Sequence, residues 1–143
     1  MTSLLFPDVN VWIALNYQHH MHHRDAQRWY EELSTTARLV FCRQTQLGLF
    51  RILTTAAVMD RDVLTQQACW QLYDRWVLTG HVVWADEPLD LETKLRLRTA
   101  AATASPKVWM DAYLAAFAET ANLTLVTFDR ALAVKAKGAI LLG

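Results

Sequence analysis

The sequence predicts an α/β/α sandwich, in which helices cover both faces of a central, mostly parallel sheet of five strands. Short apolar segments alternate along the chain with longer segments whose apolar residues recur at helical spacing. Parallel strands are buried on both faces and are joined through helices, so this alternation favours a parallel sheet. Hydrophobic residues fill 53% of the 143 positions, with only four glycines and three prolines. This composition excludes a disordered chain and predicts short loops.

The expected elements follow from apolar periodicity along the chain. The expected strands are short and mostly apolar or β-branched, and they cover residues 4–6, 39–42, 82–84, 123–127 and 139–142. On one expected helix, Ala68, Leu72 and Trp76 recur every four residues and therefore share a face. The expected helices cover residues 11–15, 25–33, 44–54, 65–78, 88–98, 106–121 and 130–137.

Helix ends are predicted from residues that cap free backbone groups. Pro88 suits the first turn of the helix at 88–98. Ser105 followed by Pro106 is typical of an N-cap and a first helical residue. Asn122 is expected to end its helix in the left-handed conformation, and Asp129 is expected to cap the helix that follows it.

Length, charge and cysteine content restrict the class of protein. The length predicts one domain covering residues 1–143. With 14 basic and 14 acidic residues the formal net charge is zero, so RNA binding would require positive charge to gather on one face. Cys42 and Cys69 are expected to be free thiols. No basic residue precedes Arg24 and no apolar run is long enough to span a membrane, so we expect a cytoplasmic protein without a signal peptide or a membrane partner.

Three aspartates occupy positions where a parallel sheet can carry chemistry. Asp8 and Asp129 each follow an expected strand, and Asp111 lies early in the helix before the fourth strand. If the first and fourth strands are neighbours, the three carboxylates converge at the carboxyl edge of the sheet. Such a group repels itself unless a cation neutralises it, and hard oxygen ligands suit Mg²⁺ or Mn²⁺. Taken singly, an aspartate such as Asp129 is as well explained by helix capping alone.

Three segments resemble the acidic motifs of PIN-domain ribonucleases. They are LFPDVNVWIAL near the start, WMDAYLAAFAETANL in the last third and LVTFDRAL after it. The segment FCRQTQLGLFRILT and the early histidines are similar to one subgroup of VapC toxins, from type II toxin–antitoxin systems. The resemblance implies a PIN-like sandwich and a divalent-metal-dependent endoribonuclease, which hydrolyses phosphodiester bonds of transfer or ribosomal RNA. It also implies a homodimer and a cognate VapB-type antitoxin.

The resemblance also assigns roles to residues by position. Asp8, Asp111 and Asp129 would be the catalytic metal ligands for Mg²⁺ or Mn²⁺. Asn10 would orient Asp8 or a water on the metal, and Thr127 would support Asp129 by hydrogen bonding. The reaction implied is in-line attack by water that the metal activates, without a protein nucleophile.

One position departs from the family pattern. PIN domains usually carry a Glu-Leu pair on the helix after the second strand, whereas this chain has Gln46-Leu47. A neutral amide leaves three carboxylates, which predicts one firmly held metal, and a glutamate at position 46 would be expected to tighten its binding. Candidate RNA-binding residues are Arg43, Arg51 and Arg130.

Three alternatives stay open at this point. The chain could be a weakly active or inactive PIN module that binds RNA or a protein, a hypothesis supported mainly by Gln46. A phosphatase with an aspartate nucleophile also places Asp after its first strand, but it requires Asp where this chain has Asn10. His19, His22 and His23 could share a zinc ion, although a polar entry to a helix explains them as well. The six tryptophans are assigned to the core by default.

Overall fold

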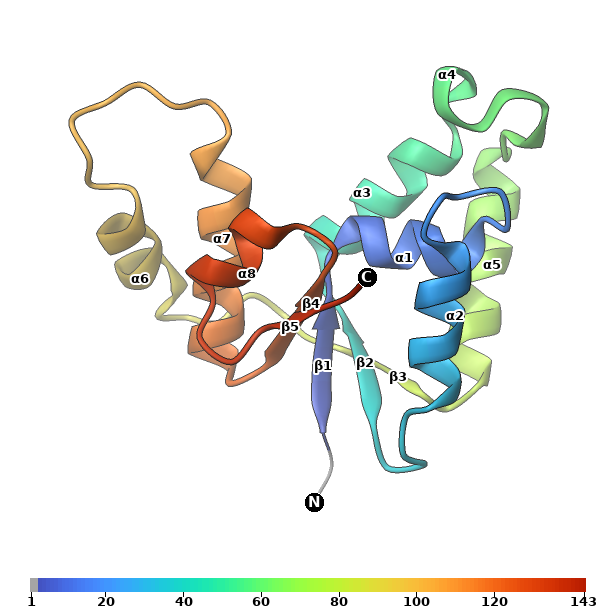
Figure 1. Ribbon diagram of the computed structural model, residues 1–143, viewed down its shortest axis with the longest axis horizontal. Coiled ribbons are helices and arrows are strands. Elements are labelled where there is room, and N and C mark those ends of the chain that lie inside the picture. Colours follow the sequence, from blue (N-terminus) through green and yellow to red (C-terminus); the bar gives the residue numbers. More distant parts are fainter. Residues whose placement is uncertain (1–2) are drawn as a thin grey trace.

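The described strands form one sheet in which every neighbouring pair is parallel (Figure 1). The computed structural model describes residues 3–143. Within these residues the strand order is β3-β2-β1-β4-β5, so the first and fourth strands are neighbours as the convergence of carboxylates requires. The bounds are Leu4–Pro7 for β1, Arg38–Phe41 for β2, Val82–Trp84 for β3, Thr124–Thr127 for β4 and Ile140–Leu141 for β5.

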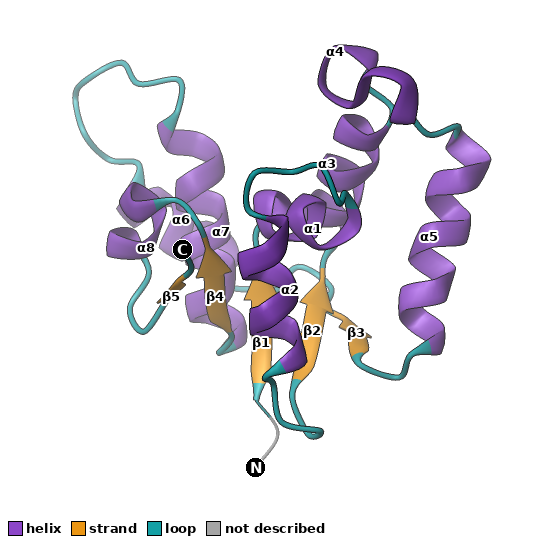
Figure 2. Cartoon of the chain, turned by 45° about the vertical axis from the view of Figure 1, so that its right-hand side comes forward, coloured by secondary structure: helices purple, strands orange, loops and turns teal. Residues whose placement is uncertain are grey.

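Helices cover both faces of the sheet, as Figures 1 and 2 show. Helices α1 to α5 lie on one side and α6 to α8 on the other. No described helix is long and apolar enough to cross a membrane. The bounds are Val9–Asn16 for α1, His23–Glu31 for α2, Arg43–Leu53 for α3, Ala56–Met59 for α4, Gln66–Leu78 for α5, Leu91–Arg98 for α6, Val108–Ala121 for α7 and Arg130–Lys135 for α8, with a short 3₁₀ helix η1 at Asp60–Asp62.

Alternate residues of each central strand supply two separate cores. On β1, Leu5 packs in the core under α1, α2, α3 and α5, while Phe6 packs in the core under α6, α7 and α8. This is the period-two alternation of a strand buried on both faces. Phe6 stacks on Phe117 of α7 with ring centroids 5.0 Å apart, and Trp12 of α1 stacks on Phe41 at 3.8 Å. The cores hold β1 at the centre of the molecule.

Several helix boundaries differ from the sequence prediction. Helix α7 begins at Val108 with Lys107 as its N-cap residue, so the assignment of Ser105 and Pro106 to cap and first turn is wrong. Helix α6 begins at Leu91, which leaves Pro88 outside it. Residues 99–107 instead form an exposed connection that serine and proline suit equally well. The last helix ends at Lys135, two residues before the predicted end, and neither α4 nor η1 was predicted.

Two predicted helix ends are confirmed. Asn122 lies in the left-handed conformation with φ 57° and ψ 50°, and it ends α7. Asp129 caps α8, because its Oδ1 accepts hydrogen bonds from the backbone N–H groups of Ala131 at 2.9 Å and Leu132 at 3.2 Å. Both caps lie next to β4, so they fix where that strand begins and where its edge meets α8.

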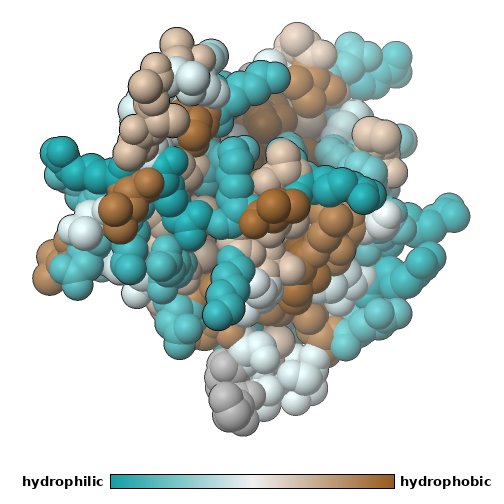
Figure 3. All heavy atoms as spheres, turned by 60° about the vertical axis from the view of Figure 1, so that its left-hand side comes forward, coloured by the Kyte–Doolittle hydropathy of each residue, from teal (hydrophilic) through white to brown (hydrophobic). Residues whose placement is uncertain are grey.

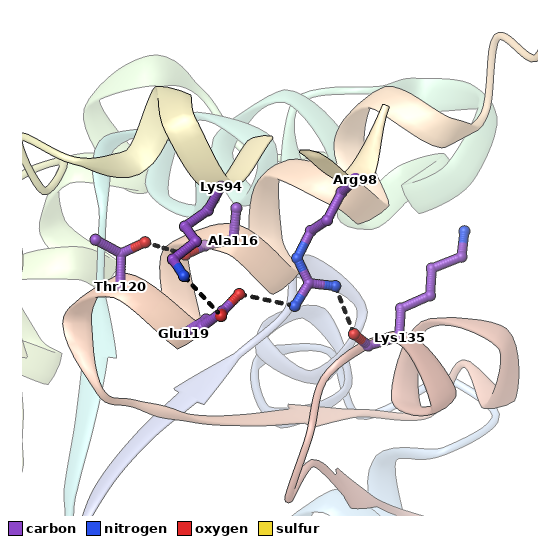
Figure 4. Close-up of polar contacts among 6 residues, drawn as sticks. All are labelled: Lys94, Arg98, Ala116, Glu119, Thr120 and Lys135. Atoms are coloured by element: carbon purple, nitrogen blue, oxygen red, sulfur yellow. Dashed lines mark hydrogen bonds and ion pairs between the residues drawn. The ribbon is translucent and has the colours of Figure 1, made fainter. Parts of the chain in front are cut away.

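An arginine ties together the three helices on one face (Figure 4). The guanidinium of Arg98, at the end of α6, donates to the carbonyl of Lys135 at 2.6 Å and to Glu119 of α7 at 3.0 Å. Lys94 lies 3.4 Å from the other oxygen of Glu119. Because Arg98 contacts both neighbours, it fixes the end of α8 against α7.

Helix α3 approaches α1 closely at a glycine. A Cβ atom added to Gly48 would lie 2.7 Å from Cγ2 of Val9. Real Cβ atoms do not come this close, and the β-branched side chain of Val9 has few rotamers with which to retreat. Gly48 therefore allows α3 to lie against the first turn of α1, directly after Asp8.

We predict that Gly48→Val destabilises the fold by about 1–3 kcal/mol, the usual cost of overpacking. The gain in helix propensity on replacing glycine is smaller than this cost. Urea unfolding of wild type, Gly48→Val, Val9→Ala and the double variant measures it. The double variant should recover part of the loss. Strictly additive effects would show that Val9 and Gly48 do not press on each other.

Candidate active site

Asp8 lies at the carboxyl end of the central strand and is almost fully buried, with 5% of its surface exposed. Its backbone N–H donates to the carbonyl of Val126 on β4 at 2.9 Å, which extends the β1–β4 pairing by one residue. Its Oδ1 accepts from the backbone N–H of Asn10 at 2.7 Å and of Val11 at 3.4 Å, and so caps α1. Asp8 is thus held by β4 on one side and by α1 above. Asn10 contributes through its backbone, and its side chain is exposed.

Thr127 joins Asp8 to Asp129. The fully buried hydroxyl of Thr127 donates a short hydrogen bond to Oδ2 of Asp8. The hydroxyl oxygen of Thr127 in turn accepts a hydrogen bond from the backbone N–H of Asp129 at 2.9 Å. The prediction assigned Thr127 to Asp129 alone, whereas the structure shows that it supports both aspartates. One buried side chain therefore links the carboxylate of Asp8 to the backbone of Asp129.

Asp111 lies in the first turn of α7 and pairs with a lysine. Its Oδ2 is 3.5 Å from Nζ of Lys135, at the end of α8. In Figure 4 the side chain of Lys135 points away from Arg98, which binds only its backbone carbonyl. The backbone of Lys135 is thus anchored while its ammonium group neutralises Asp111. Both partners are partly exposed, so the pair contributes little to stability.

Burial makes the charge on Asp8 unfavourable. Desolvation raises the pKa of Asp8 above its usual value, and the nearby negative charge of Asp129 raises it further. The hydrogen bonds from Thr127 and from the backbone N–H groups of Asn10 and Val11 lower it, but they do not outweigh burial. A cation beside Asp8 and Asp129 would relieve both the desolvation and the repulsion.

The donor atoms at this edge suit a hard divalent cation. Carboxylate oxygens are the ligands that Mg²⁺ and Mn²⁺ prefer, and Asp8 combines such oxygens with an unfavourable buried charge. Within residues 3–143, no three His, Cys, Asp or Glu side chains lie close enough together to hold a metal ion. The structure therefore couples Asp8 with Asp129, and it leaves Asp111 on Lys135 rather than in a group of three. We call Asp8, Asp129 and Asp111 the acidic edge.

Gln46 is buried in the first turn of α3 and binds an arginine. It is 2% exposed, and its Oε1 accepts from Nη1 of Arg43 at 2.5 Å. The Arg43 guanidinium lies over the ring of Trp84, 4.6 Å from its centre. A glutamate at position 46 would form an ion pair with this guanidinium. The positive charge of Arg43 would then offset the negative charge that was expected to tighten metal binding.

The other two candidate RNA-binding arginines occupy different places. Arg130 is exposed and directly follows Asp129 at the start of α8. Arg51 is in the last turn of α3, eight residues or about 12 Å along the helix from its first residue, Arg43. Arg43 and Arg130 therefore flank the acidic edge on either side, and Arg51 lies away from it.

The histidine segment contacts α1, the loop after β4 and itself. The Nδ1 of His23 lies 2.6 Å from the carbonyl oxygen of Ala14, and His22 stacks on Phe128 at 4.3 Å. The Nδ1 of His20 accepts from the backbone N–H of His22 at 3.0 Å. These contacts place the segment beside the loop that carries Asp129, and they agree with a polar entry to α2.

Sequence reasoning missed residues whose role depends on distant contacts. It did not single out Lys135 as a partner of Asp111, nor Trp84 as a support for Arg43. The core assignment holds fully for Trp12, but Trp84, at 37% exposed, is not a core residue. Trp70 and Trp109 are also exposed.

The fold and the acidic edge first define a class, the α/β/α proteins that carry carboxylates after neighbouring parallel strands. A sequence model of the PIN domain matches residues 5–138. The chain belongs to the PIN domain family.

Ribonuclease VapC41 of Mycobacterium tuberculosis is 39% identical over 132 residues, which are 90% of this chain and 90% of that protein. Ribonuclease VapC39 of the same organism is 34% identical over 140 residues, covering 98% and 97%.

Solved structures share the fold at low sequence identity. VapC20 of Mycobacterium tuberculosis, a toxin that cleaves the sarcin–ricin loop, superposes with a TM-score of 0.65 at 15% identity over 91% of this chain and 93% of that one. VapBC2 of Rickettsia felis, solved on a DNA fragment of its promoter, gives 0.65 at 12% identity over 96% of both chains. These likenesses confirm the predicted sandwich.

We predict that metal-free protein loses stability as the pH rises above about 4, the pKa of aspartate in an unfolded chain. The raised pKa of Asp8 means that the folded state keeps this proton to higher pH than the unfolded state. Stability must then fall until the raised pKa is passed and stay low above it. Asp8→Asn should abolish this fall. Urea unfolding in EDTA at several pH values measures both proteins, and parallel pH profiles would contradict the assignment.

Proposed function

We propose that this chain is the toxin of a type II toxin–antitoxin pair and acts as an endoribonuclease that depends on Mg²⁺ or Mn²⁺. The observation that carries the proposal is the coupling of buried Asp8 to Asp129 through Thr127, in a chain of the PIN domain family. The relatives named as ribonucleases support RNA as the substrate. By analogy with VapC20, whose target is a ribosomal RNA loop, we place the substrate among transfer or ribosomal RNAs.

The residues of the acidic edge divide the work of hydrolysis. Asp8 is fixed on two sides and gives the site its position, while Asp129 is exposed and can adjust. Asp111, which pairs with Lys135 at 3.5 Å, would serve as a third ligand if it left that ion pair. A bound Mg²⁺ or Mn²⁺ supplies a Lewis acid for the phosphate oxygens and lowers the pKa of water. Thr127 holds the carboxylate of Asp8 and the backbone of Asp129 through one hydroxyl group.

We also propose a homodimer that an antitoxin of the VapB type inhibits, in the cytoplasm. Large apolar side chains are exposed on the three helices of one face, namely Leu97, Trp109, Met110 and Val134. In Figure 3, which looks toward this side, hydrophobic residues gather near the centre of the view with hydrophilic residues around them. Apolar surface surrounded by polar residues is typical of protein interfaces. The toxin–antitoxin complexes among the structural neighbours support an antitoxin partner. The two buried cysteines are free thiols, which suit the reducing environment of the cytoplasm.

An inactive RNA-binding module is the second candidate. Its support is that Lys135 already neutralises Asp111 and that Gln46 is neutral. The hypothesis of an inactive module does not explain why a charged Asp8 is buried, at a cost in desolvation, when Asn would cap α1 equally well.

We predict that purified protein cleaves bulk transfer or ribosomal RNA with Mn²⁺ and that EDTA stops it. Asp8→Asn, Asp111→Asn and Asp129→Asn should each lower the rate by at least about 100-fold, because metal catalysis supplies several kcal/mol. Asp25→Asn, at an exposed carboxylate on α2, is the matched control and should retain full activity. Gel electrophoresis of the products measures cleavage. Absence of cleavage by folded wild type, or full activity of Asp8→Asn, would favour the inactive module.

A further inference from the structure

Arg43 is a cation held in place without a charged partner. Its guanidinium donates to Oε1 of Gln46 at 2.5 Å and lies 4.6 Å from the ring centre of Trp84. Within residues 3–143 it forms no ion pair, since each described ion pair joins other residues. The amide of Gln46 orients the guanidinium through this hydrogen bond. Because the amide is neutral, it does not cancel the positive charge of Arg43. An exposed arginine ordinarily loses side-chain freedom when it binds a ligand, and this one has already lost part of it.

Two acidic residues follow Trp84 closely in the chain, and each accepts a hydrogen bond from an aromatic side chain. Asp86 accepts from Nε1 of Trp84 at 2.8 Å, at the edge of the indole, and Glu87 accepts from the hydroxyl of Tyr113 at 2.9 Å. The face of Trp84 is therefore left to Arg43. A planar guanidinium on an aromatic face keeps N–H groups at its rim for an anion, and it binds phosphate in a forked geometry that lysine cannot provide.

The sheet places Arg43 one strand away from Asp8. Phe41 pairs with Trp84, and Leu5 pairs with Leu39. Continuing the β1–β2 register by three residues from Leu5 and Leu39 puts Asp8 beside Cys42, the residue before Arg43. Neighbouring strands lie about 4.8 Å apart. The ends of β3, β2, β1 and β4 therefore present an indole, a guanidinium, a buried carboxylate and an exposed carboxylate in that order.

We propose that Arg43, oriented by Gln46 and Trp84, binds a backbone phosphate of the RNA next to the one that is cleaved, on the β2–β3 side of the acidic edge. This inference rests on the proposed ribonuclease function. It adds the direction in which the RNA backbone leaves the cleavage site, namely toward β2 and β3. The carboxylates cannot bind RNA without a cation, because like charges repel, whereas Arg43 attracts the neighbouring phosphate directly. In this arrangement Gln46 is a positioning residue, and its neutrality is essential. A carboxylate there would form an ion pair with Arg43 and cancel the charge that binds phosphate.

The test is RNA binding in EDTA, where the acidic edge holds no cation and nothing is cleaved. Fluorescence anisotropy of fluorescein-labelled oligouridylate, measured over a series of salt concentrations, gives the affinity and its salt dependence. Arg43→Gln should weaken binding several-fold and reduce the slope of log affinity against log salt by about 0.7, the value for one phosphate contact on a single strand. Gln46→Glu should reduce it by a similar amount although Arg43 is still present. Arg28→Gln, at an exposed arginine on α2, is the matched control and should leave the slope unchanged.

Cleavage by the same proteins with Mn²⁺ separates this inference from the proposed function. We expect Arg43→Gln to raise KM more than it lowers kcat, because the contact is to the substrate backbone. Wild type that cleaves RNA, together with an unchanged salt slope in Arg43→Gln, would overturn the phosphate site and leave the nuclease standing. An unchanged slope in Gln46→Glu alone would overturn the positioning role of Gln46. Wild type that neither binds nor cleaves RNA would overturn both proposals.

Discussion

The buried carboxylate of Asp8 is the constraint on which the rest of the site depends. Hydrogen-bonding groups of Asn10, Val11, Trp12, Val126 and Thr127 converge on this residue. They bind both its backbone and its side chain, yet they do not offset the cost of burying its charge. A protein that needed only a helix cap could use an uncharged residue here. In the proposed function a cation supplies the missing stabilisation, so the position of Asp8 and its reactivity would have the same physical origin.

Local signals in the sequence predicted the sheet and the placement of Asp8 and Asp129 directly after its strands. Asp8 and Asp129 follow apolar strands directly, and each also caps the next helix, so two independent local features point to the same residues. Predictions failed where local features were ambiguous. Ser105 and Pro106 suit a helix start and an exposed connection equally, and in the structure α7 begins only at Val108. Contacts between distant segments, such as Arg43 with Trp84 and Asp111 with Lys135, had no local signal.

A neutral chain can still bind RNA, because its charges are separated along one edge of the sheet. The formal net charge of zero gives no attraction at long range. Positive groups nevertheless lie on both sides of the carboxylates, with Arg43 after β2 and Arg130 after Asp129. Lys135 adds an ammonium group that neutralises Asp111. The proposed RNA binding therefore rests on the placement of individual cations on helices rather than on total charge.

Calorimetric titration of Mn²⁺ into metal-free protein tests the central claim most directly, namely that the buried charge of Asp8 is balanced by a divalent cation. The account predicts one ion per chain for wild type, no measurable binding for folded Asp8→Asn, and tighter binding for Lys135→Gln, because the ammonium group no longer competes for Asp111. Equal Mn²⁺ affinities for wild type and Asp8→Asn would contradict it, since the carboxylate on which the site is built would then take no part in holding the ion.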